Sequence, residues 1–262
     1  FALSHSPLVK SVRRIVSTGD APWMEPGELA VSLNGLVREG RAAVIDPTGG
    51  LEDLARRRLR LAGPTSLSDD PVRALRGVRL ALECNLTIEP PIRTAIRHIA
   101  PRLAETSPER LRDEWVALLS LGRSALGMRE LDRLRLLTVI LPEAQAMKRV
   151  VQPRPHRFTV WEHSLKTVEA VERLLLRLDA LDPFGVDLAR HLAEPLGDGC
   201  TRKEALKIAG LLHDVAKPQT RSVSSGRIRF IGHDTMGALM AEAACRRWRL
   251  AGRAEHVIER LV

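Results

Sequence analysis

Histidine and aspartate residues recur in three short motifs in the second half of the chain. Trp161-Glu162-His163, Leu212-His213-Asp214 and Gly232-His233-Asp234 place their histidines at positions 163, 213 and 233. Imidazole and carboxylate groups both bind divalent metal ions, and side chains from separate helices can converge on one ion. These residues are therefore candidates for a metal site, although the same histidines could instead form hydrogen bonds within a core. The remaining histidines, His5, His98, His156, His191 and His256, are expected to have surface or capping roles.

Three arginines, Arg73, Arg76 and Arg79, follow one another at steps of three residues. On a helix this spacing places their side chains along one side, where like charges repel. An anionic partner should offset that repulsion. The candidates are either the phosphates of a nucleotide or RNA, or carboxylates within the chain, namely Glu52, Asp53, Glu109 and Glu114.

The elements that must position these residues are mostly helices. From Leu51 onward, apolar residues recur three and four positions apart, which is the period of an amphipathic helix. This pattern predicts helices over 51–62, 70–84, 90–104, 108–121 and 124–137, and then over 159–179, 202–217, 234–250 and 252–262. Ser68, Asp69 or Asp70 is predicted to cap the second of these helices, and Ser107 to open the fourth.

Proline and glycine mark the remaining segments. Residues 1–50 are the least helical, and the short apolar runs 29–31 and 42–45 predict strands of an α/β domain. Residues 180–200 are predicted to form a connector, and Thr220 to Ile231 a hairpin that turns at Ser225-Gly226. The proline-containing stretch 142–156 predicts a domain boundary near residue 150. The expected fold is therefore mainly α, in three parts: a short α/β segment over 1–50, a helical block over 51–150 and an all-α block over 151–262.

The composition favours a folded protein with a polyanionic partner. The 262 residues are 44% hydrophobic and 28% charged, and Lys plus Arg exceed Asp plus Glu by 41 to 32, for a net charge of +9. That excess favours nucleic acid as a partner, although a well-solvated arginine-rich surface gives the same number. Tyr is absent and aromatic residues make up 3% of the chain. A base-stacking platform is therefore disfavoured, and any RNA binding must rest mainly on backbone charge.

Cysteine usage and hydropathy bear on the compartment. The three cysteines, Cys84, Cys200 and Cys245, include no CxxC pair, which suits a reducing cytosol rather than a disulfide framework. No stretch approaches the ~18 apolar residues that a spanning helix needs, and the first residues lack a basic segment followed by an apolar run. We therefore expect a cytoplasmic protein without a membrane partner; these features leave the oligomeric state open.

Three further segments resemble consecutive motifs of class II tRNA nucleotidyltransferases and bacterial poly(A) polymerases in both order and spacing. The segments are Asp46–Leu54 (DPTGGLEDL), Asp69–Arg76 (DDPVRALR) and Glu109–Glu114 (ERLRDE). The resemblance covers about residues 30–150. It implies that the first motif, with Asp46, Gly49, Gly50 and Asp53, links a catalytic head to a helical neck, so that residues 1–50 are a remnant of that head. It implies that the third motif, with Glu109, Arg110 and Glu114, steadies the neck helices.

The second motif implies a nucleotide-binding site. In the family its aspartate and arginine contact the incoming base, which assigns that role to Asp70 and Arg73 and places Arg76 beside them. A carboxylate accepts a hydrogen bond from an exocyclic amine, and a guanidinium donates to a ring nitrogen or carbonyl, so the pair can bind cytosine or adenine. Asp69 stands where the family usually has Glu, which shortens the side chain but keeps its charge.

The polymerising centre of that family has no counterpart in this sequence. The family holds two Mg²⁺ ions with an Asp-x-Asp pair for in-line nucleotidyl transfer, and the chain contains neither Asp-x-Asp nor Gly-Ser. Its one Gly-Gly, Gly49-Gly50, belongs to the first motif. Val31–Leu36 resembles the segment that closes the head, with Asn34 in the matching place. No catalytic residue for nucleotidyl transfer is therefore identified, and whether the head was lost or removed stays open.

The segment Ile208–Pro218, which contains His213-Asp214, resembles the HD phosphohydrolase superfamily when His163 and Gly232-His233 are taken with it. The resemblance implies that His163, His213 and Asp214 are metal ligands and that His233 is a further ligand or a phosphate contact. It implies that Lys217 neutralises phosphate charge. Some tRNA nucleotidyltransferases carry an HD domain after their neck and body helices. Both resemblances therefore imply one architecture over about residues 30–262.

The sequence supports three hypotheses. The first is an enzyme that adds nucleotides from CTP or ATP to the 3′ end of tRNA or another RNA, with Mg²⁺ as cofactor. The second is a phosphohydrolase or phosphodiesterase that acts on RNA ends or nucleotides and uses a divalent metal of unknown identity. The third is an RNA-binding protein without enzymatic activity. In the second case the neck helices would only bind RNA or dimerise. We hypothesise that three arginine clusters give salt-dependent affinity for tRNA-like RNA, namely Arg56-Arg57-Arg58, Arg73-Arg76-Arg79 and Arg246-Arg247-Arg249.

Overall fold

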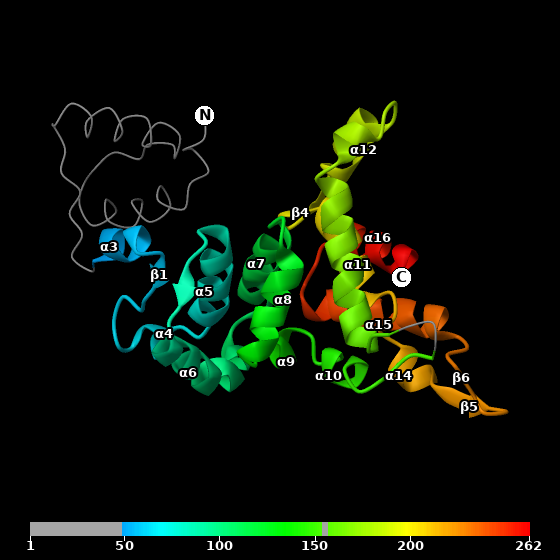
Figure 1. Cartoon of the computed structure of the whole chain (residues 1–262), viewed down its shortest axis with the longest axis horizontal. Coiled ribbons are helices and arrows are strands. Elements are labelled where there is room, and N and C mark those ends of the chain that lie inside the picture. The colour runs from blue at the N-terminus through cyan, green and yellow to red at the C-terminus, as the bar shows by residue number, and fades with distance from the viewer. Residues whose placement is uncertain (1–48, 154–156) are drawn as a thin grey trace.

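The computed structural model describes residues 49–153 and 157–262. This part of the chain is mainly helical and contains three two-stranded sheets. In Figure 1 the helices of residues 50–133 lie on one side of the molecule and those of residues 160–262 on the other, while α10 lies below α11. The predicted strands 29–31 and 42–45, and with them Asp46, lie outside the described residues.

The first block is a succession of short helices with one parallel pair of strands. Its helices are α3 (Gly50–Ala55), α4 (Ser66–Asp69), α5 (Val72–Glu83), α6 (Pro90–Ile99), the 3-10 helix η1 (Ala100–Glu105), α7 (Pro108–Leu119), α8 (Ser124–Arg133), α9 (Leu137–Ile140) and α10 (Ala144–Met147). Strand β1 (Arg58–Leu59) pairs in parallel with β2 (Thr87–Ile88), with Arg58 opposite Thr87.

The second block is helical apart from two antiparallel hairpins. Its helices are α11 (Val160–Leu175), the 3-10 helix η2 (Leu178–Ala180), α12 (Gly185–Leu192), α13 (Arg202–Leu212), α14 (Lys217–Thr220), α15 (His233–Arg247) and α16 (Gly252–Leu261). Strands β3 (Pro195–Gly197) and β4 (Cys200–Thr201) form the first hairpin, and β5 (Ser222–Ser224) and β6 (Arg227–Arg229) form the second. The second hairpin confirms the turn predicted at Ser225-Gly226. Within the described ranges, none of the helices has the length and apolar character needed to cross a bilayer.

The predicted helix over 51–62 is wrong beyond Ala55. Arg57 adopts a left-handed conformation with φ 52°, which ends the helix and turns the chain into β1. The carbonyl of Arg57 then accepts a hydrogen bond from the amide of Thr87 at 2.8 Å. Arg58 and Arg60 converge on the carboxylate of Asp53 at 3.4 and 2.8 Å. The reversal therefore serves to bring two arginines onto one buried acid.

Other differences also fall at helix ends. The helix predicted over 90–104 changes to 3-10 geometry at Ala100, because Pro101 cannot donate an amide hydrogen bond. The helix predicted over 202–217 ends at Leu212, and His213 and Asp214 lie in the turn before α14. Helix α5 begins after Pro71. Ser68 and Asp69 belong to the separate α4 and do not cap it, whereas Asp70 is extended and its carboxylate accepts from the backbone of Val72. The connector predicted over 180–200 contains α12 and most of the β3–β4 hairpin.

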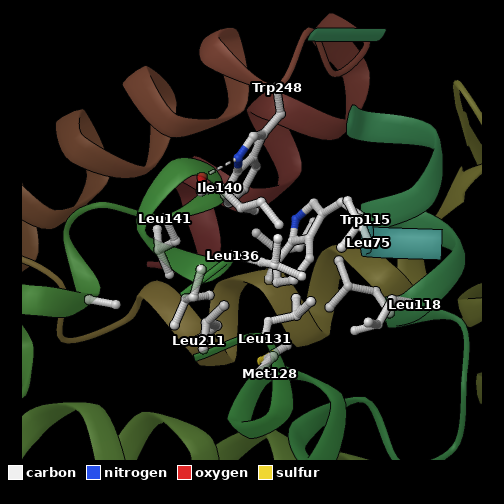
Figure 2. Close-up of a cluster of buried hydrophobic side chains, with 14 of the residues drawn as sticks. Leu75, Trp115, Leu118, Met128, Leu131, Leu136, Ile140, Leu141, Leu211 and Trp248 are labelled. Carbon is white, nitrogen blue, oxygen red and sulfur yellow. Dashed lines mark hydrogen bonds between the residues drawn. The ribbon is translucent and has the colours of Figure 1, made fainter. Parts of the chain in front are cut away.

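One apolar core runs through both blocks. Leu75, Trp115 and Met128 from the first block and Leu211 and Trp248 from the second belong to the same cluster of buried side chains. Figure 2 shows this cluster, with the rings of Trp115 and Trp248 close together; their centroids are 5.7 Å apart. The indole Nε1 of Trp248 donates to the carbonyl of Ile140 at 2.8 Å, the dashed line in Figure 2. The core therefore continues past the boundary proposed near residue 150.

Buried polar contacts reinforce this junction at the turn between α7 and α8. The ammonium group of Lys207, on α13, donates to the carbonyls of Leu119 and Leu121, both at 2.7 Å. The carboxylate of Glu172, on α11, accepts from the amide of Ser124 at 2.5 Å and from its hydroxyl at 2.7 Å. A cation thus sits at the C-terminal end of α7 and an anion at the N-terminal end of α8, as the helix dipoles favour.

Candidate metal centre and arginine site

Of the four residues expected to meet at a metal site, His163, His213 and Asp214 converge, and His233 lies outside this group. One ligand atom from each lies within 4.8 Å of the others, which is close enough for a single metal ion. His163 comes from the first turn of α11, and His213 and Asp214 come from the turn between α13 and α14. The Asp214 carboxylate is buried, whereas both imidazoles are partly exposed. The cluster is therefore open on the side of the histidines.

The hydrogen bonds of His213 define which ring nitrogen faces Asp214. The Nδ1 of His213 lies 2.9 Å from the carbonyl of Gly210, and because a carbonyl only accepts, Nδ1 must carry the proton. The Nε2 then faces Oδ2 of Asp214 at 3.2 Å. Two lone pairs at that distance repel unless a proton or a cation lies between them. A divalent cation fits this arrangement, because metal-bound histidines commonly donate their second N–H to a carbonyl.

The pKa values of His213 and Asp214 are both shifted in the direction that favours positive charge on or beside the imidazole. Burial disfavours the charged form of Asp214, but hydrogen bonds with His213 and Lys217 outweigh it and lower the pKa of Asp214 to about 2. Burial likewise opposes protonation of His213, yet the hydrogen bond to Asp214 raises the pKa of that imidazole above its usual value. Both shifts therefore favour positive charge between the His213 imidazole and the Asp214 carboxylate.

His233 and Lys217 complete the surroundings of Asp214. The Nε2 of His233 lies 3.8 Å from Oδ1 of Asp214, and its Nδ1 lies 2.7 Å from the carbonyl of Phe230. It therefore approaches the other carboxylate oxygen and is not part of the three-residue group. The ammonium of Lys217 donates to Oδ2 of Asp214 at 2.8 Å.

Sequence reasoning missed Gln152. Its side chain is buried, and its Oε1 accepts from Lys217 at 2.7 Å, so it holds the ammonium beside Asp214. Its Nε2 is buried without a hydrogen-bond partner in the described part of the chain. A single glutamine between Val151 and Pro153 carries no recognisable pattern, so the sequence offered no signal for it. The ring of Phe230 packs under the same ammonium, with 5.4 Å from Nζ to the ring centroid.

The second candidate site lies at the start of α5, where Asp70 and Arg73 are neighbours. Oδ2 of Asp70 lies 3.6 Å from Nε of Arg73 and accepts a hydrogen bond from Arg110 at 2.6 Å. That bond from the Arg110 guanidinium holds the pKa of Asp70 below its usual range. Arg73 also donates through Nη1 to the carbonyl of Ser66 at 3.1 Å, while its buried Nε makes no hydrogen bond to any described residue.

Arg76 and Arg79 pair with carboxylates inside the protein. Both donate to the buried Glu114 of α7, Arg76 at 2.5 Å and Arg79 at 2.8 Å. Arg79 also pairs with Glu83 at 2.6 Å. Of the two alternatives drawn from the sequence, internal pairing therefore holds for these two arginines, and Glu114 joins α7 to α5 through them.

The remaining motif residues lie in different places. Gly49 is left-handed with φ 71° at the N-terminus of α3, which begins at Gly50, and Asp53 binds Arg58 and Arg60. Glu109 does not reach α5; its carboxylate lies 4.0 Å from Arg249 of the second block. The motifs flanking Asp70 and Arg73 thus hold neighbouring elements together.

Comparison with known proteins finds a matching family for a part of each block. Residues 85–148 match a family profile described as "Probable RNA and SrmB- binding site of polymerase A", and residues 160–262 match the HD domain. Over 223 residues the chain is 36% identical to the A-adding tRNA nucleotidyltransferase of Deinococcus radiodurans, covering 82% of this chain and 46% of that protein. The chain belongs to the tRNA nucleotidyltransferase and poly(A) polymerase family, and it carries an HD domain.

Other members of this family match at similar levels. The CC-adding tRNA nucleotidyltransferase of Thermus thermophilus is 35% identical over 220 residues, which cover 81% of this chain and 45% of the relative. Poly(A) polymerase I of Haemophilus influenzae is 35% identical over 99 residues, which cover 37% of this chain and 22% of the relative. The chain spans about half the length of the tRNA nucleotidyltransferases it matches.

A solved structure titled "tRNA-processing enzyme (apo form 2)" shares the fold. It superposes with a TM-score of 0.54 at 16% identity, over 85% of this chain and 50% of that one. At that identity the likeness concerns the arrangement of the helices alone. The mainly helical architecture of this chain therefore also occurs in that structure.

Proposed function

We propose that this chain is the nucleotide- and RNA-binding part of a cytoplasmic tRNA nucleotidyltransferase. The whole enzyme uses CTP or ATP to extend the 3′ end of tRNA, with Mg²⁺ at its polymerising site. The observation that carries the proposal is the placement of Asp70 and Arg73 side by side at the start of α5, with Nε of Arg73 3.6 Å from Asp70. The names of the relatives support it.

These two side chains have the donors and acceptors that base selection requires. Arg110 keeps Asp70 ionised, so the carboxylate only accepts, as the exocyclic amine of cytosine or adenine needs. Arg73 donates to a ring nitrogen or carbonyl of the same base. The Nε of Arg73 is buried against Asp70, whereas the Arg73 side chain as a whole is 32% exposed. A base edge can therefore reach the guanidinium outside that buried atom.

The residues present do not fit the two Mg²⁺ ions of nucleotidyl transfer, because the sequence contains no Asp-x-Asp. We therefore assign no step of phosphoryl transfer to this chain. Its part in the reaction is to orient the base and to hold the RNA. Template-free selection between bases needs no more than that, since the discrimination resides in hydrogen bonds to the base edge.

Nucleotide binding to the 262-residue chain tests the proposal. Calorimetric titrations with CTP, ATP, GTP and UTP should show preference for CTP or ATP, and Arg73→Ala should remove it. The loss of a charged hydrogen bond is worth about 1.5–3 kcal/mol. Arg102→Ala, which removes an exposed pair with Glu105, is the matched control and should leave the preference intact. An unchanged base preference in a folded Arg73→Ala protein contradicts the assignment of Arg73 to base selection. Asp70 and Arg73 would then form only an internal ion pair.

A second function is favoured by the convergence of His163, His213 and Asp214. We propose that these residues hold a divalent cation in an HD phosphohydrolase site. Bound there, the cation supplies an acidified water and polarises a phosphoester oxygen. Lys217, held by Gln152 and Asp214, neutralises charge on the phosphate. His233 orients the substrate through Nε2, since its Nδ1 is committed to the carbonyl of Phe230.

Hydrolysis of p-nitrophenyl phosphate and its bis ester tests this second function. Activity should require added divalent metal and disappear in Asp214→Ala with the circular dichroism spectrum unchanged. His256→Ala serves as the control, because His256 is exposed and only approaches Glu259, at 3.9 Å. Activity that survives Asp214→Ala refutes the assignment and reduces the HD block to a scaffold, as does a lack of metal dependence.

A further inference from the structure

The β5–β6 hairpin carries unpaired positive charge beside the HD cluster. The arginines singled out in the sequence are largely neutralised: Arg56 pairs with Glu52, Arg246 with Glu242 and Glu255, and Arg247 with Glu143. The hairpin differs. No carboxylate occurs between Asp214 and Asp234, whereas that stretch contains Lys217, Arg221, Arg227 and Arg229. Among residues 49–153 and 157–262, none forms an ion pair with the three arginines of this stretch.

The register of the hairpin sorts its side chains by polarity. Ser222 pairs with Arg229 and Ser224 with Arg227, while Val223 pairs with Ile228. Cross-strand partners lie on the same face of a hairpin, and successive residues alternate between faces. One face therefore presents Arg227, Arg229 and two serine hydroxyls, and the other presents Val223 and Ile228. The two guanidinium groups start from Cα atoms about 7 Å apart, at two residues of strand rise.

This hairpin projects from the body of the protein. In Figure 1, β5 and β6 extend beyond α14 and α15 at one edge of the molecule. Ser222 through Arg227 and Arg229 are all exposed, and Val223 is 60% exposed. A two-stranded hairpin is only marginally stable by itself in water. Such an element packs little apolar surface, so burial alone does not account for it.

Both ends of the hairpin are fixed to the HD cluster. Lys217 precedes it in α14 and donates to Asp214. At the other end, the carbonyl of Phe230 holds Nδ1 of His233 at 2.7 Å, and the ring of Phe230 packs under Lys217. The base of the hairpin therefore lies beside His233 and Lys217, and a linear polyanion bound to the hairpin can continue from its base to these two residues.

We propose that the β5–β6 hairpin binds the phosphate backbone of a single RNA strand whose terminal phosphate reacts at the HD cluster. The inference rests on the proposed phosphohydrolase function and names its substrate class as a polynucleotide end. Arginine and serine are common phosphate ligands in protein–nucleic acid interfaces. A mononucleotide at the cluster meets Lys217 and His233 but cannot span both guanidinium groups of β6 as well. An anionic membrane suits the hairpin less, because its exposed apolar residue Val223 lies on the face opposite Arg227 and Arg229.

Equilibrium binding without metal tests the hairpin directly. A fluorescein-labelled 12-nucleotide single-stranded RNA is titrated with the 262-residue chain in EDTA at several salt concentrations, with anisotropy as the readout. Arg227→Gln/Arg229→Gln should weaken binding at least tenfold at low salt. It should also reduce the slope of log K against log salt by about 1.4, since each phosphate contact on a single strand contributes about 0.7. Arg253→Gln/Arg260→Gln is the matched control, because it removes the same charge at exposed positions of α16.

Equal affinity and slope in the two double variants overturn the proposal. It is also overturned if the native chain binds phosphatidylserine vesicles through Arg227 and Arg229 but not the RNA. Release of phosphate from the same RNA carrying a 3′-phosphate is then measured with added divalent metal. This measurement separates RNA binding by the hairpin from phosphohydrolase activity at the HD cluster. Failure of that release with hairpin-dependent binding intact refutes the phosphohydrolase alone. A KM for this RNA that rises in the hairpin variant and not in the control supports both.

Discussion

The ammonium group of Lys207 lies 3.5 Å from the carboxylate of Glu172, and both side chains are buried. Each also binds backbone of the turn between α7 and α8, Lys207 through two carbonyls and Glu172 through the amide of Ser124. The second block thus supplies the charges that complete two helix ends of the first.

Replacing Lys207 should therefore cost substantial stability. Lys207→Met leaves a buried carboxylate without its cation and two carbonyls without donors, so we expect a loss of about 3–5 kcal/mol. Urea denaturation followed by circular dichroism measures it. Lys203→Met, at a partly exposed position on the same helix, should change the free energy of unfolding by less than about 1 kcal/mol. If Lys207→Met also lowered the free energy of unfolding by less than about 1 kcal/mol, the contacts of Lys207 would not stabilise the junction between the two blocks.

The shared acid of the arginine helix gives a second prediction. Glu114→Gln removes the charge that holds Arg76 and Arg79 together while keeping the shape of the side chain. We expect the free energy of unfolding to fall by about 1.5–3 kcal/mol, the value of a charged hydrogen bond. Glu105→Gln, whose partner Arg102 is exposed, should have little effect under the same thermal or urea assay. Equal effects of the two substitutions would mean that Glu114 gains nothing from burial.

A third prediction concerns pH. Because Arg110 lowers the folded-state pKa of Asp70, their pair stabilises the protein fully above the unfolded value, about pH 4. That contribution disappears as the pH falls through the lower folded pKa. Arg110→Gln should return the pKa of Asp70 toward about 3.9, measured by ¹³C NMR titration of the carboxyl. The stability difference between the two proteins should shrink below pH 4. An unshifted Asp70 titration in the variant would exclude Arg110 as the cause.

Metal binding gives a fourth prediction. Calorimetric titration with Mn²⁺ should show one site per chain, and Asp214→Asn should abolish it, because this carboxylate faces both imidazoles of the group. His233→Gln should weaken binding about 10- to 100-fold, as expected for a residue that supports a ligand. His256→Ala should bind as the native chain does. Equal affinity in Asp214→Asn would place the ion elsewhere.

Helices and turns with a local sequence pattern were predicted well, whereas features that depend on contacts between distant residues were not. The apolar repeat located most helices, and Ser225-Gly226 located the hairpin, because both signals are local. Arg57 was missed because nothing in a run of three arginines indicates positive φ at the second. Similarly, Lys207 lies within an apolar run and looks like a misplaced charge until the carbonyls of Leu119 and Leu121 are seen beside it.

The candidate sites show the same division. The histidine and aspartate motifs indicated four metal-site residues, and three of them converge, since few residue types can bind a metal ion. Gln152 had no such signature, and its contact with Lys217 spans 65 positions in the chain. For the arginine helix, spacing left phosphate and carboxylate partners equally open. Only the position of α7 against α5 decided that Glu114 serves Arg76 and Arg79.

The contact between Trp115 and Trp248 bears on how such proteins can be recombined. Its rings come from α7 and from the end of α15, and Trp248 also depends on the carbonyl of Ile140. A chimaera that joins this HD block to the neck of another relative at residue 150 inherits one indole without its counterpart. A segment exchanged between relatives should therefore begin before α7 and not at the start of the HD block. Trp115, Ile140 and Trp248 are then inherited together.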